Sequence, residues 1–334
     1  MAIKGTSKWP LVIFSHGLFG SRIAYSQFCG RVASEGYVVL AIEHRDGTGS
    51  SVKIRSANQK IRTLTYTRYD EVGWGKHTKP AGLYPFRAEQ LVFRTNEVYE
   101  IYHSFKALVD GDAGNIRNEI SESGHDLSQW KGKIDVDDLH LTGHSFGGAT
   151  VFAFLRHPPP EPFEPLPLKS VLALDPWVGP VPSPGPIPAT VFEKPSLAVI
   201  NSEGFTLWEE HFQLLKDIVS HWKTEAGASA TLVTIGTLCV VGALWMEGIL
   251  AVLISLFLVK STHKDFSDFP VAFPFTAKRA LKMANIIHTL ATSFFRNSLE
   301  AELGKEPRKG EEVWQDKIGK KHLVGKFGEV LVHS

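Results

Sequence analysis

The stretch Leu139–Leu155, LHLTGHSFGGATVFAFL, decides the fold class. It begins as a short apolar run, passes through the segment GHSFG at residues 143–147 and continues with the apolar spacing of a helix. A G-x-S-x-G segment between a strand and a helix holds its serine on a sharp, exposed turn, where small neighbours such as Gly143 and Gly147 avoid collisions. We therefore predict that Ser145 is a nucleophile. The alternative is a glycine-rich turn with an incidental serine.

Short apolar runs and helical segments alternate along the rest of the chain. Strands are expected at 11–15, 37–43, 138–143, 169–175, 196–203 and 231–235, and helices at 22–35, 86–110, 146–156, 207–222 and 278–300. This alternation predicts an α/β fold in which helices cover both faces of a mostly parallel sheet. Residues 44–85 are polar and punctuated by glycine, so we expect a long loop there.

A serine nucleophile needs a base and an acid that orients the base. In α/β-hydrolases the acid comes first along the chain and the histidine follows it. Asp175 ends the predicted strand KSVLALD and fits the acid, with Glu203 at the end of the next strand as its rival. Among 14 histidines, His263 in STHKDFSDF is the best placed base.

Other histidines receive structural assignments. His211 and His221 look like parts of a helix face, and the side chain of His144 is expected to point away from the serine. His44 reads as a loop histidine bonded to backbone. His16 is expected to position the loop after the first strand.

The oxyanion formed during acyl transfer needs backbone N–H donors. We expect them from Phe146, directly after the serine, and from Leu18 in the loop that His16 positions. The sequence has no HExxH or CxxC pattern and no glycine-rich phosphate loop, so no metal and no cofactor are predicted.

Composition limits the class of protein and its setting. The 334 residues are 43% hydrophobic with a formal net charge of +1, and a basic stripe of the kind that binds nucleic acid is not apparent. With Cys29 and Cys239 as the only cysteines and no apolar signal segment, we expect a cytoplasmic protein, membrane-associated in one interpretation given below. We expect one hydrolase domain over 1–303 and a charged tail over 304–334; the oligomeric state is left open.

Six motifs together resemble one family. They occur in the order PLVIFSHGL, AIEHRDG, LTGHSFGGAT, LALDPW, VINSE and STHKDFSDF, between about Trp9 and Pro270. The chain resembles the platelet-activating-factor acetylhydrolases of the lipoprotein-associated and intracellular monomeric type. The resemblance implies an α/β-hydrolase fold and calcium-independent removal of acetyl, short or oxidised acyl groups from the sn-2 position of phospholipids.

Carried over position by position, the resemblance assigns the residues of the site. Ser145 would be the nucleophile, His263 the base, and Asp175, favoured over Glu203, the acid. The N–H groups of Leu18 and Phe146 would form the oxyanion hole. Two other functions stay open, a general short-chain carboxylesterase and a non-catalytic hydrolase-like protein.

The chain departs from the family pattern at two places. The HGL strand begins here at Leu11, so we expect the strands that precede it in the family to be absent or replaced. An apolar insertion, residues 228–259 with Glu247 as its one charge, stands before His263. It is long enough for a membrane-spanning helix, but an element lying in a lipid surface is easier because Glu247 is costly at mid-membrane. A third interpretation takes residues 236–259 as a retained intron.

Overall fold

The computed structural model describes residues 8–56, 58, 60–112, 127–181, 194–224, 229–235, 262–272, 274–305, 313–315, 321–323 and 329–333. Of the apolar insertion, residue 228 and residues 236–259 lie outside these ranges. The interpretations of the insertion therefore stay predictions. In the part of the chain that the structure describes, no helix combines the length and the apolar character that crossing a membrane requires.

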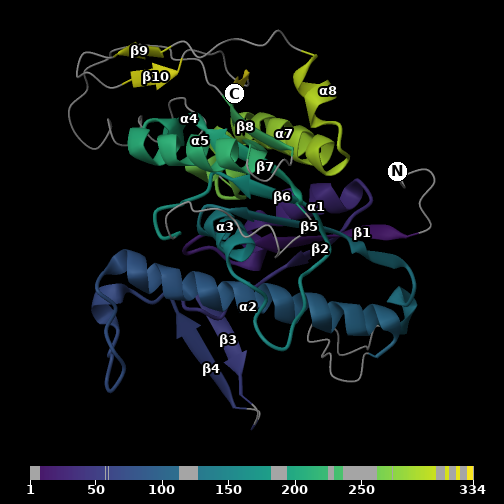
Figure 1. Ribbon diagram of the computed structural model, residues 1–334, viewed down its shortest axis with the longest axis vertical. Helices are drawn as coiled ribbons and strands as arrows, with labels where there is room; N and C mark the ends of the chain where they lie inside the picture. The colour runs from purple at the N-terminus through teal and green to yellow at the C-terminus, as the bar shows by residue number, and fades with distance from the viewer. Residues whose placement is uncertain are drawn as a thin grey trace.

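A seven-stranded sheet forms the centre of the molecule (Figure 1). Its order is β11 (Val330–His333), β8 (Ala230–Ile235), β7 (Ser196–Ser202), β6 (Leu168–Leu174), β5 (Ile134–His144), β1 (Trp9–Ser15) and β2 (Val38–Ala41). All neighbouring strands pair in parallel except β11, which pairs antiparallel with β8. The predicted α/β-hydrolase fold with a mostly parallel sheet is confirmed.

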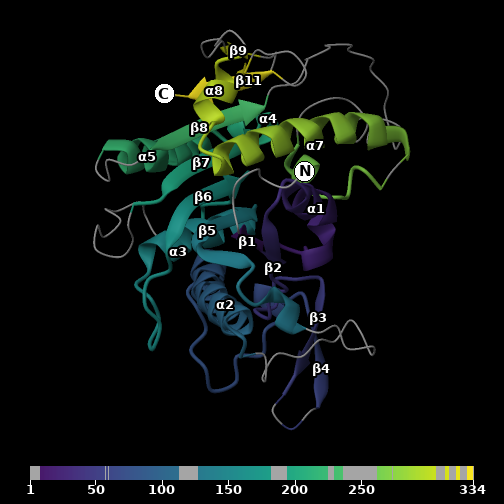
Figure 2. The ribbon, with the colours of Figure 1, turned by 90° about the vertical axis from the view of Figure 1, so that its right-hand side faces the viewer.

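Helices cover both faces of this sheet. Figure 2 shows α1 and α7 on one side and α3 and α5 on the other. The helices are η1 (Arg22–Tyr25), α1 (Ser26–Ser34), η2 (Tyr69–Glu71), α2 (Leu83–Asp110), η3 (Leu127–Trp130), α3 (Phe146–Arg156), α4 (Glu203–Thr206), α5 (Glu209–Thr224), η4 (His263–Phe266), α7 (Pro274–Phe295) and α8 (Leu299–Leu303). The segment predicted as one helix over 278–300 is thus divided between α7 and α8.

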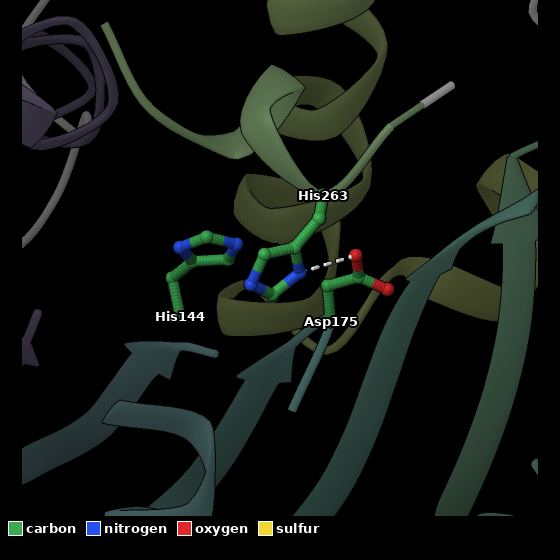
Figure 3. Close-up of side chains that lie close together, drawn as sticks. All are labelled: His144, Asp175 and His263. Carbon is green, nitrogen blue, oxygen red and sulfur yellow. Dashed lines mark hydrogen bonds and ion pairs between the residues drawn. The ribbon is translucent and has the colours of Figure 1, made fainter. Parts of the chain in front are cut away.

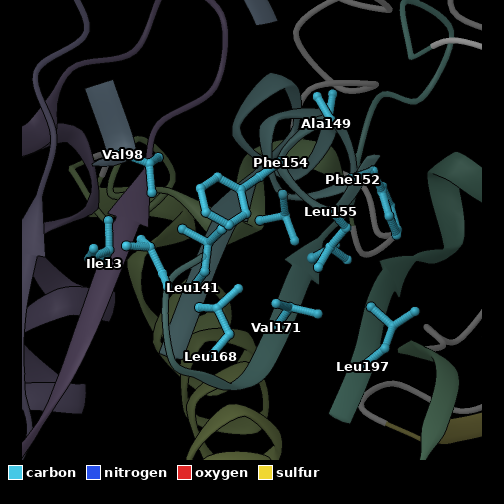
Figure 4. Close-up of a cluster of buried hydrophobic side chains, with 14 of the residues drawn as sticks. Ile13, Val98, Leu141, Ala149, Phe152, Phe154, Leu155, Leu168, Val171 and Leu197 are labelled. Carbon is cyan, nitrogen blue, oxygen red and sulfur yellow. The ribbon is translucent and has the colours of Figure 1, made fainter. Parts of the chain in front are cut away.

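Alternate residues of each strand enter two separate cores, because successive side chains of a strand point to opposite faces. Leu11 and Ile13 of β1 join the core under α2, α3 and α5, part of which Figure 4 shows. Val12 and Phe14 join the core under α1 and α7. Strands buried on both faces read as continuous apolar runs, which is why the sequence located them.

Two segments differ from the prediction. The loop expected over 44–85 contains an antiparallel hairpin of β3 (Ser51–Arg55) and β4 (Ile61–Thr65). Both strands expose most of their side chains, so they lack the apolar run by which the other strands were found. In the segment 304–334, predicted as a charged tail, β9 (Val313–Gln315) pairs with β10 (Lys321–Leu323), and β11 joins the central sheet.

Candidate active site

The turn from β5 to α3 places Ser145 above the sheet edge. Ser145 has φ 58° and ψ −116°, a conformation that is costly for a residue with a side chain. A Cβ on Gly143 would collide with the backbone of Gly147, and one on Gly147 with the carbonyl of Ser15. Glycine is therefore required at both positions for the strand, the turn and the helix to pack this closely.

Three side chains from separate parts of the chain meet at this turn. Oγ of Ser145 lies 2.7 Å from Nε2 of His263. On the other side of the same ring, Nδ1 of His263 donates to Oδ2 of Asp175 at 2.8 Å, the dashed line in Figure 3. The carboxylate thereby fixes the tautomer in which Nε2 accepts the serine proton.

Asp175 is fully buried at the carboxyl end of β6 and is held from two sides. Its Oδ1 accepts from the backbone N–H of Ser202 at 2.9 Å, and its Oδ2 accepts from the Ser202 hydroxyl at 2.7 Å. Glu203, the rival in the sequence, begins α4 instead. The structure thus brings the carboxylate of Asp175 into contact with His263.

His263 is presented by η4, the short helix after the apolar insertion. Thr262 and Asp265 form a capping box at its start, which satisfies its first N–H groups. Asp265 also pairs with Arg279 of α7 at 3.1 Å. These contacts tie the short helix of the histidine to α7.

Two rings pack against the imidazole of His263. Phe205 of α4 stacks on it with 4.4 Å between centroids and 5° between planes. His144 lies against it with 4.4 Å between centroids and 37° between planes (Figure 3). The side chain of His144, which we expected to point away from the serine, thus packs against the base, a contact that the sequence interpretation did not anticipate.

A buried tyrosine connects His144 with the loop after β1. The Tyr25 hydroxyl lies 2.8 Å from Nδ1 of His144 and accepts the N–H of Gly17 at 3.1 Å. Burial raises the pKa of Tyr25 to about 12, so its hydroxyl keeps the proton that it donates to His144. Burial, and then the nearby His263, lower the pKa of His144 well below its usual value. His144 therefore stays neutral beside an imidazole that must take up a proton.

The two predicted oxyanion donors belong to two segments next to the serine, the start of α3 and the loop after β1. Phe146 begins α3, so its N–H belongs to the first turn, where amides have no acceptor within the helix. The loop with Leu18 passes over the serine, since a Cβ on Gly17 would lie 3.0 Å from Cβ of Ser145. The Leu18 side chain packs on the core and anchors that loop.

A second serine, histidine and acid form a chain beneath this loop. Ser15 Oγ lies 2.8 Å from Nε2 of His44, and Nδ1 of His44 lies 2.7 Å from Oε2 of Glu97. All three are buried, so a substrate has no access to them. The ring of His44 thus bonds side chains, not the backbone that we predicted. His16 bonds the carbonyl of Gly17 at 2.8 Å, as expected of a residue that positions this loop.

The donor atoms of His144, Asp175 and His263 lie within 4.8 Å of one another. Such a group resembles a metal site, but its bonding is that of a proton relay. Both ring nitrogens of His263 are engaged, one with Ser145 and one with Asp175. A metal ion bound there would break one of these bonds.

The sequence interpretation missed Ser202, Phe205 and Tyr25. Ser202 lies at the carboxyl end of β7, the strand next to Asp175, and parallel neighbours end at the same edge of a sheet. That rule alone was a usable signal for Ser202. Phe205 and Tyr25 lie on short helices, and their contacts depend on packing that local sequence does not encode.

Comparison with known proteins identifies a family that the chain matches. The model of a family described as platelet-activating factor acetylhydrolase, isoform II, matches residues 1–298. Platelet-activating factor acetylhydrolase of Bos taurus is 35% identical over 177 residues, 52% of this chain and 36% of that protein. The protein of the same name from Gallus gallus is 28% identical over 229 residues, 66% of this chain and 50% of that protein. The chain therefore spans between about a third and a half of the length of these curated relatives.

Among the solved structures that are similar to this chain is a ferulic acid esterase from Streptomyces cinnamoneus. It superposes with a TM-score of 0.45 at 16% sequence identity, over 88% of this chain and 68% of that chain.

Proposed function

Because the chain belongs to the platelet-activating factor acetylhydrolase isoform II family, we propose that it is a serine hydrolase of phospholipids. It releases the sn-2 acetyl group, or a short or oxidised acyl group, in the manner of a 1-alkyl-2-acetylglycerophosphocholine esterase. The family and the relatives' names support the substrate class. Ser145, His263 and Asp175 are the catalytic residues in this proposal.

One observation carries it: a single imidazole, His263, bonds the hydroxyl of Ser145 and the carboxylate of Asp175 with its two nitrogens. A serine hydroxyl is a weak nucleophile until a base takes its proton. The strained turn at Ser145 and the buried position of Asp175 keep this arrangement formed before substrate binds. This geometry suits acyl transfer, and the proposed reaction uses only side chains and backbone N–H groups of the protein.

The reaction runs in two halves. His263 takes the Ser145 proton as Oγ attacks the ester carbonyl, and the N–H groups of Leu18 and Phe146 stabilise the oxyanion. The tetrahedral intermediate collapses, the sn-2 oxygen leaves with the proton from His263, and acetyl-Ser145 remains. Water then gives a proton to His263 and attacks the acetyl group. The second tetrahedral intermediate collapses, acetate leaves, and His263 returns the proton to Oγ of Ser145.

A lipid surface is the proposed setting for this substrate. Three apolar side chains adjoin the two loops of the site and are largely exposed: Phe19 at 62%, Ile23 at 71% and Phe269 at 53%. Phe19 follows Leu18 in the chain, and Phe269 follows the short helix of His263. Ala24, next to Ile23, accepts the N–H of Asp268 at 2.9 Å, which brings these two segments together. Apolar side chains beside a site favour contact with lipid.

The decisive experiment compares ester substrates on purified protein. Hydrolysis of a 1-alkyl-2-acetyl phosphocholine, with far slower hydrolysis of the same lipid bearing a long sn-2 chain, is expected. Rapid cleavage of 4-nitrophenyl acetate without cleavage of either lipid would favour a general short-chain carboxylesterase. Inertness towards all three would favour a non-catalytic protein.

The apolar insertion enters this proposal as a peripheral membrane contact. A variant lacking residues 236–259 joins Ile235 to Lys260 and leaves Ser145, Asp175 and His263 in place. If the insertion is an interfacial anchor, the variant loses activity on phospholipid vesicles and keeps it on 4-nitrophenyl acetate. If the insertion is a retained intron, both activities persist. Loss of both activities would contradict the two interpretations alike.

A further inference from the structure

Arg94 of α2 is a fully buried cation that the reaction scheme above does not use. Its side chain is 0% exposed, and its Nε donates to Oδ2 of Asp46 at 2.8 Å. The side chain of Asp46 is 1% exposed. Removing two charges from water costs several kcal/mol per ion, and apolar side chains of the same size often stabilise a fold as well. A buried ion pair therefore suggests that these side chains fix the positions of neighbouring groups more than they stabilise the fold.

The guanidinium reaches several separate segments at once. Its first terminal nitrogen donates to the carbonyl of His16 at 2.6 Å and lies 3.3 Å from Oγ of Ser15. Its second donates to the hydroxyl of Thr48. A planar group with donors in fixed directions fits this task, whereas the single ammonium of a lysine does not.

Two of these partners, His16 and Thr48, fix the chain just before and just after Leu18. His16, whose carbonyl Arg94 holds, stands two residues before it. Phe19, the next residue after it, donates its N–H to the carbonyl of Thr48 at 2.7 Å. The hydroxyl of the same Thr48 bonds Arg94. The segment that carries one predicted oxyanion donor is therefore held at both ends through one side chain.

Phe146, which carries the second predicted donor, also contacts the guanidinium of Arg94. The guanidinium carbon of Arg94 lies 4.8 Å from the centroid of the Phe146 ring, over its face. The first terminal nitrogen also lies 3.5 Å from Oγ1 of Thr150, one turn further along α3. A cation over an aromatic ring contributes more when both are buried. Arg94 thus contacts the start of α3 as well as the loop of Leu18.

We propose that Arg94 is a positioning residue that sets the distance between the two oxyanion N–H groups, those of Leu18 and Phe146. It acts through His16, Thr48 and the Phe146 ring, and it touches neither substrate nor Ser145. The inference rests on the proposed serine hydrolase function. It deepens that function, because a hole with misplaced donors stabilises the oxyanion less while substrate binding is unchanged.

The test uses Arg94→Lys, which keeps the charge opposite Asp46 but cannot make all the bonds. With 4-nitrophenyl acetate we expect kcat to fall by roughly 10- to 100-fold, less than the 10²–10³ of a deleted donor, with KM nearly unchanged. A trifluoromethyl ketone forms a tetrahedral adduct with the serine, and its affinity should fall by the same factor. The melting temperature is measured alongside.

Arg87→Lys is the matched control. Arg87 is a buried arginine on the same helix, and its bonds go to Gln90 at 2.6 Å and Tyr66 at 2.7 Å. Its replacement leaves the bonds of Arg94 to His16 and Thr48 in place, so kcat and inhibitor affinity should stay within about twofold.

A second pair covers the case in which Arg94→Lys unfolds at assay temperature. Thr48→Val removes the hydroxyl that accepts from Arg94, and Thr95→Val, whose hydroxyl bonds the carbonyl of Leu91 within α2, is its control. A parallel fall of kcat and inhibitor affinity in Thr48→Val alone supports the inference. Unchanged kcat and inhibitor affinity in a folded Arg94→Lys or Thr48→Val would overturn it. An inert wild type would overturn the proposed function instead, and this inference with it.

Discussion

The imidazole of His263 stacks on the phenyl ring of Phe205, with 4.4 Å between centroids and 5° between ring planes. The histidine itself is one-third exposed and arrives from a short helix after a long insertion. A flat contact of this kind restricts the tilt of the ring. It therefore complements the Asp175 bond, which fixes only one nitrogen.

Phe205→Leu should lower kcat by about two- to tenfold, the range that 0.5–1.5 kcal/mol of ring contact converts to. Leucine keeps much of the apolar area, so the fold should persist. Steady-state kinetics on a soluble ester measure the effect. Phe212→Leu on α5, whose ring meets His333 and not the site, is the control and should leave kcat unchanged. Equal rates for the two variants would argue against the stacking role.

Substitutions of the two candidate acids, Asp175 and Glu203, are expected to change kcat by very different amounts. Asp175→Asn keeps the size of the side chain but removes the carboxylate that orients His263, so kcat should fall by roughly 10⁴. Glu203→Gln should stay within about tenfold, since the carboxylate that bonds His263 is that of Asp175. Paired kinetic measurements decide between them, and the reverse pattern would transfer the role of the acid to Glu203.

Stability should depend on acid pH through Asp46. Burial alone would raise the pKa of Asp46, but the charge of Arg94 and the hydrogen bonds from Thr48 lower it to about 2. Because the folded pKa lies below the unfolded one, the carboxylate contributes on the order of 2 kcal/mol above pH ~4. This contribution is lost as the pH falls through about 2.

Urea unfolding of the wild type and of Asp46→Asn measures this contribution. The wild type should be the more stable protein at pH 6, and the difference in unfolding free energy should shrink between pH ~4 and pH ~2. A difference that stays constant over this range would contradict the depressed pKa of Asp46.

The parts of the site that could be predicted from sequence are those fixed by local geometry or by strand ends. The turn at Ser145 is encoded within residues 143–147, and Asp175 ends an apolar strand, where the active edge of a parallel sheet lies. The hairpin of β3 and β4 could not be predicted in this way. Its side chains are mostly exposed, so its pairing leaves no buried pattern.

Contacts between segments that are distant in the chain could also not be predicted from the sequence. The contact of His144 with His263 was not predicted, because it arises only when η4 folds back over the sheet edge. Arg94 reads in sequence as one more charge on a long helix. Its burial depends on Asp46, which lies 48 residues earlier in a loop.

The proposed function depends above all on Ser145 as the nucleophile. Its most direct test treats wild type and Ser145→Ala with a fluorophosphonate probe and then assays 1-alkyl-2-acetyl phosphocholine. Wild type should be labelled at Ser145 and lose activity in proportion. Ser145→Ala should remain folded and unlabelled, with kcat lower by roughly 10⁴–10⁶. Labelling or acetate release that persists in Ser145→Ala would contradict the role of Ser145 as the nucleophile.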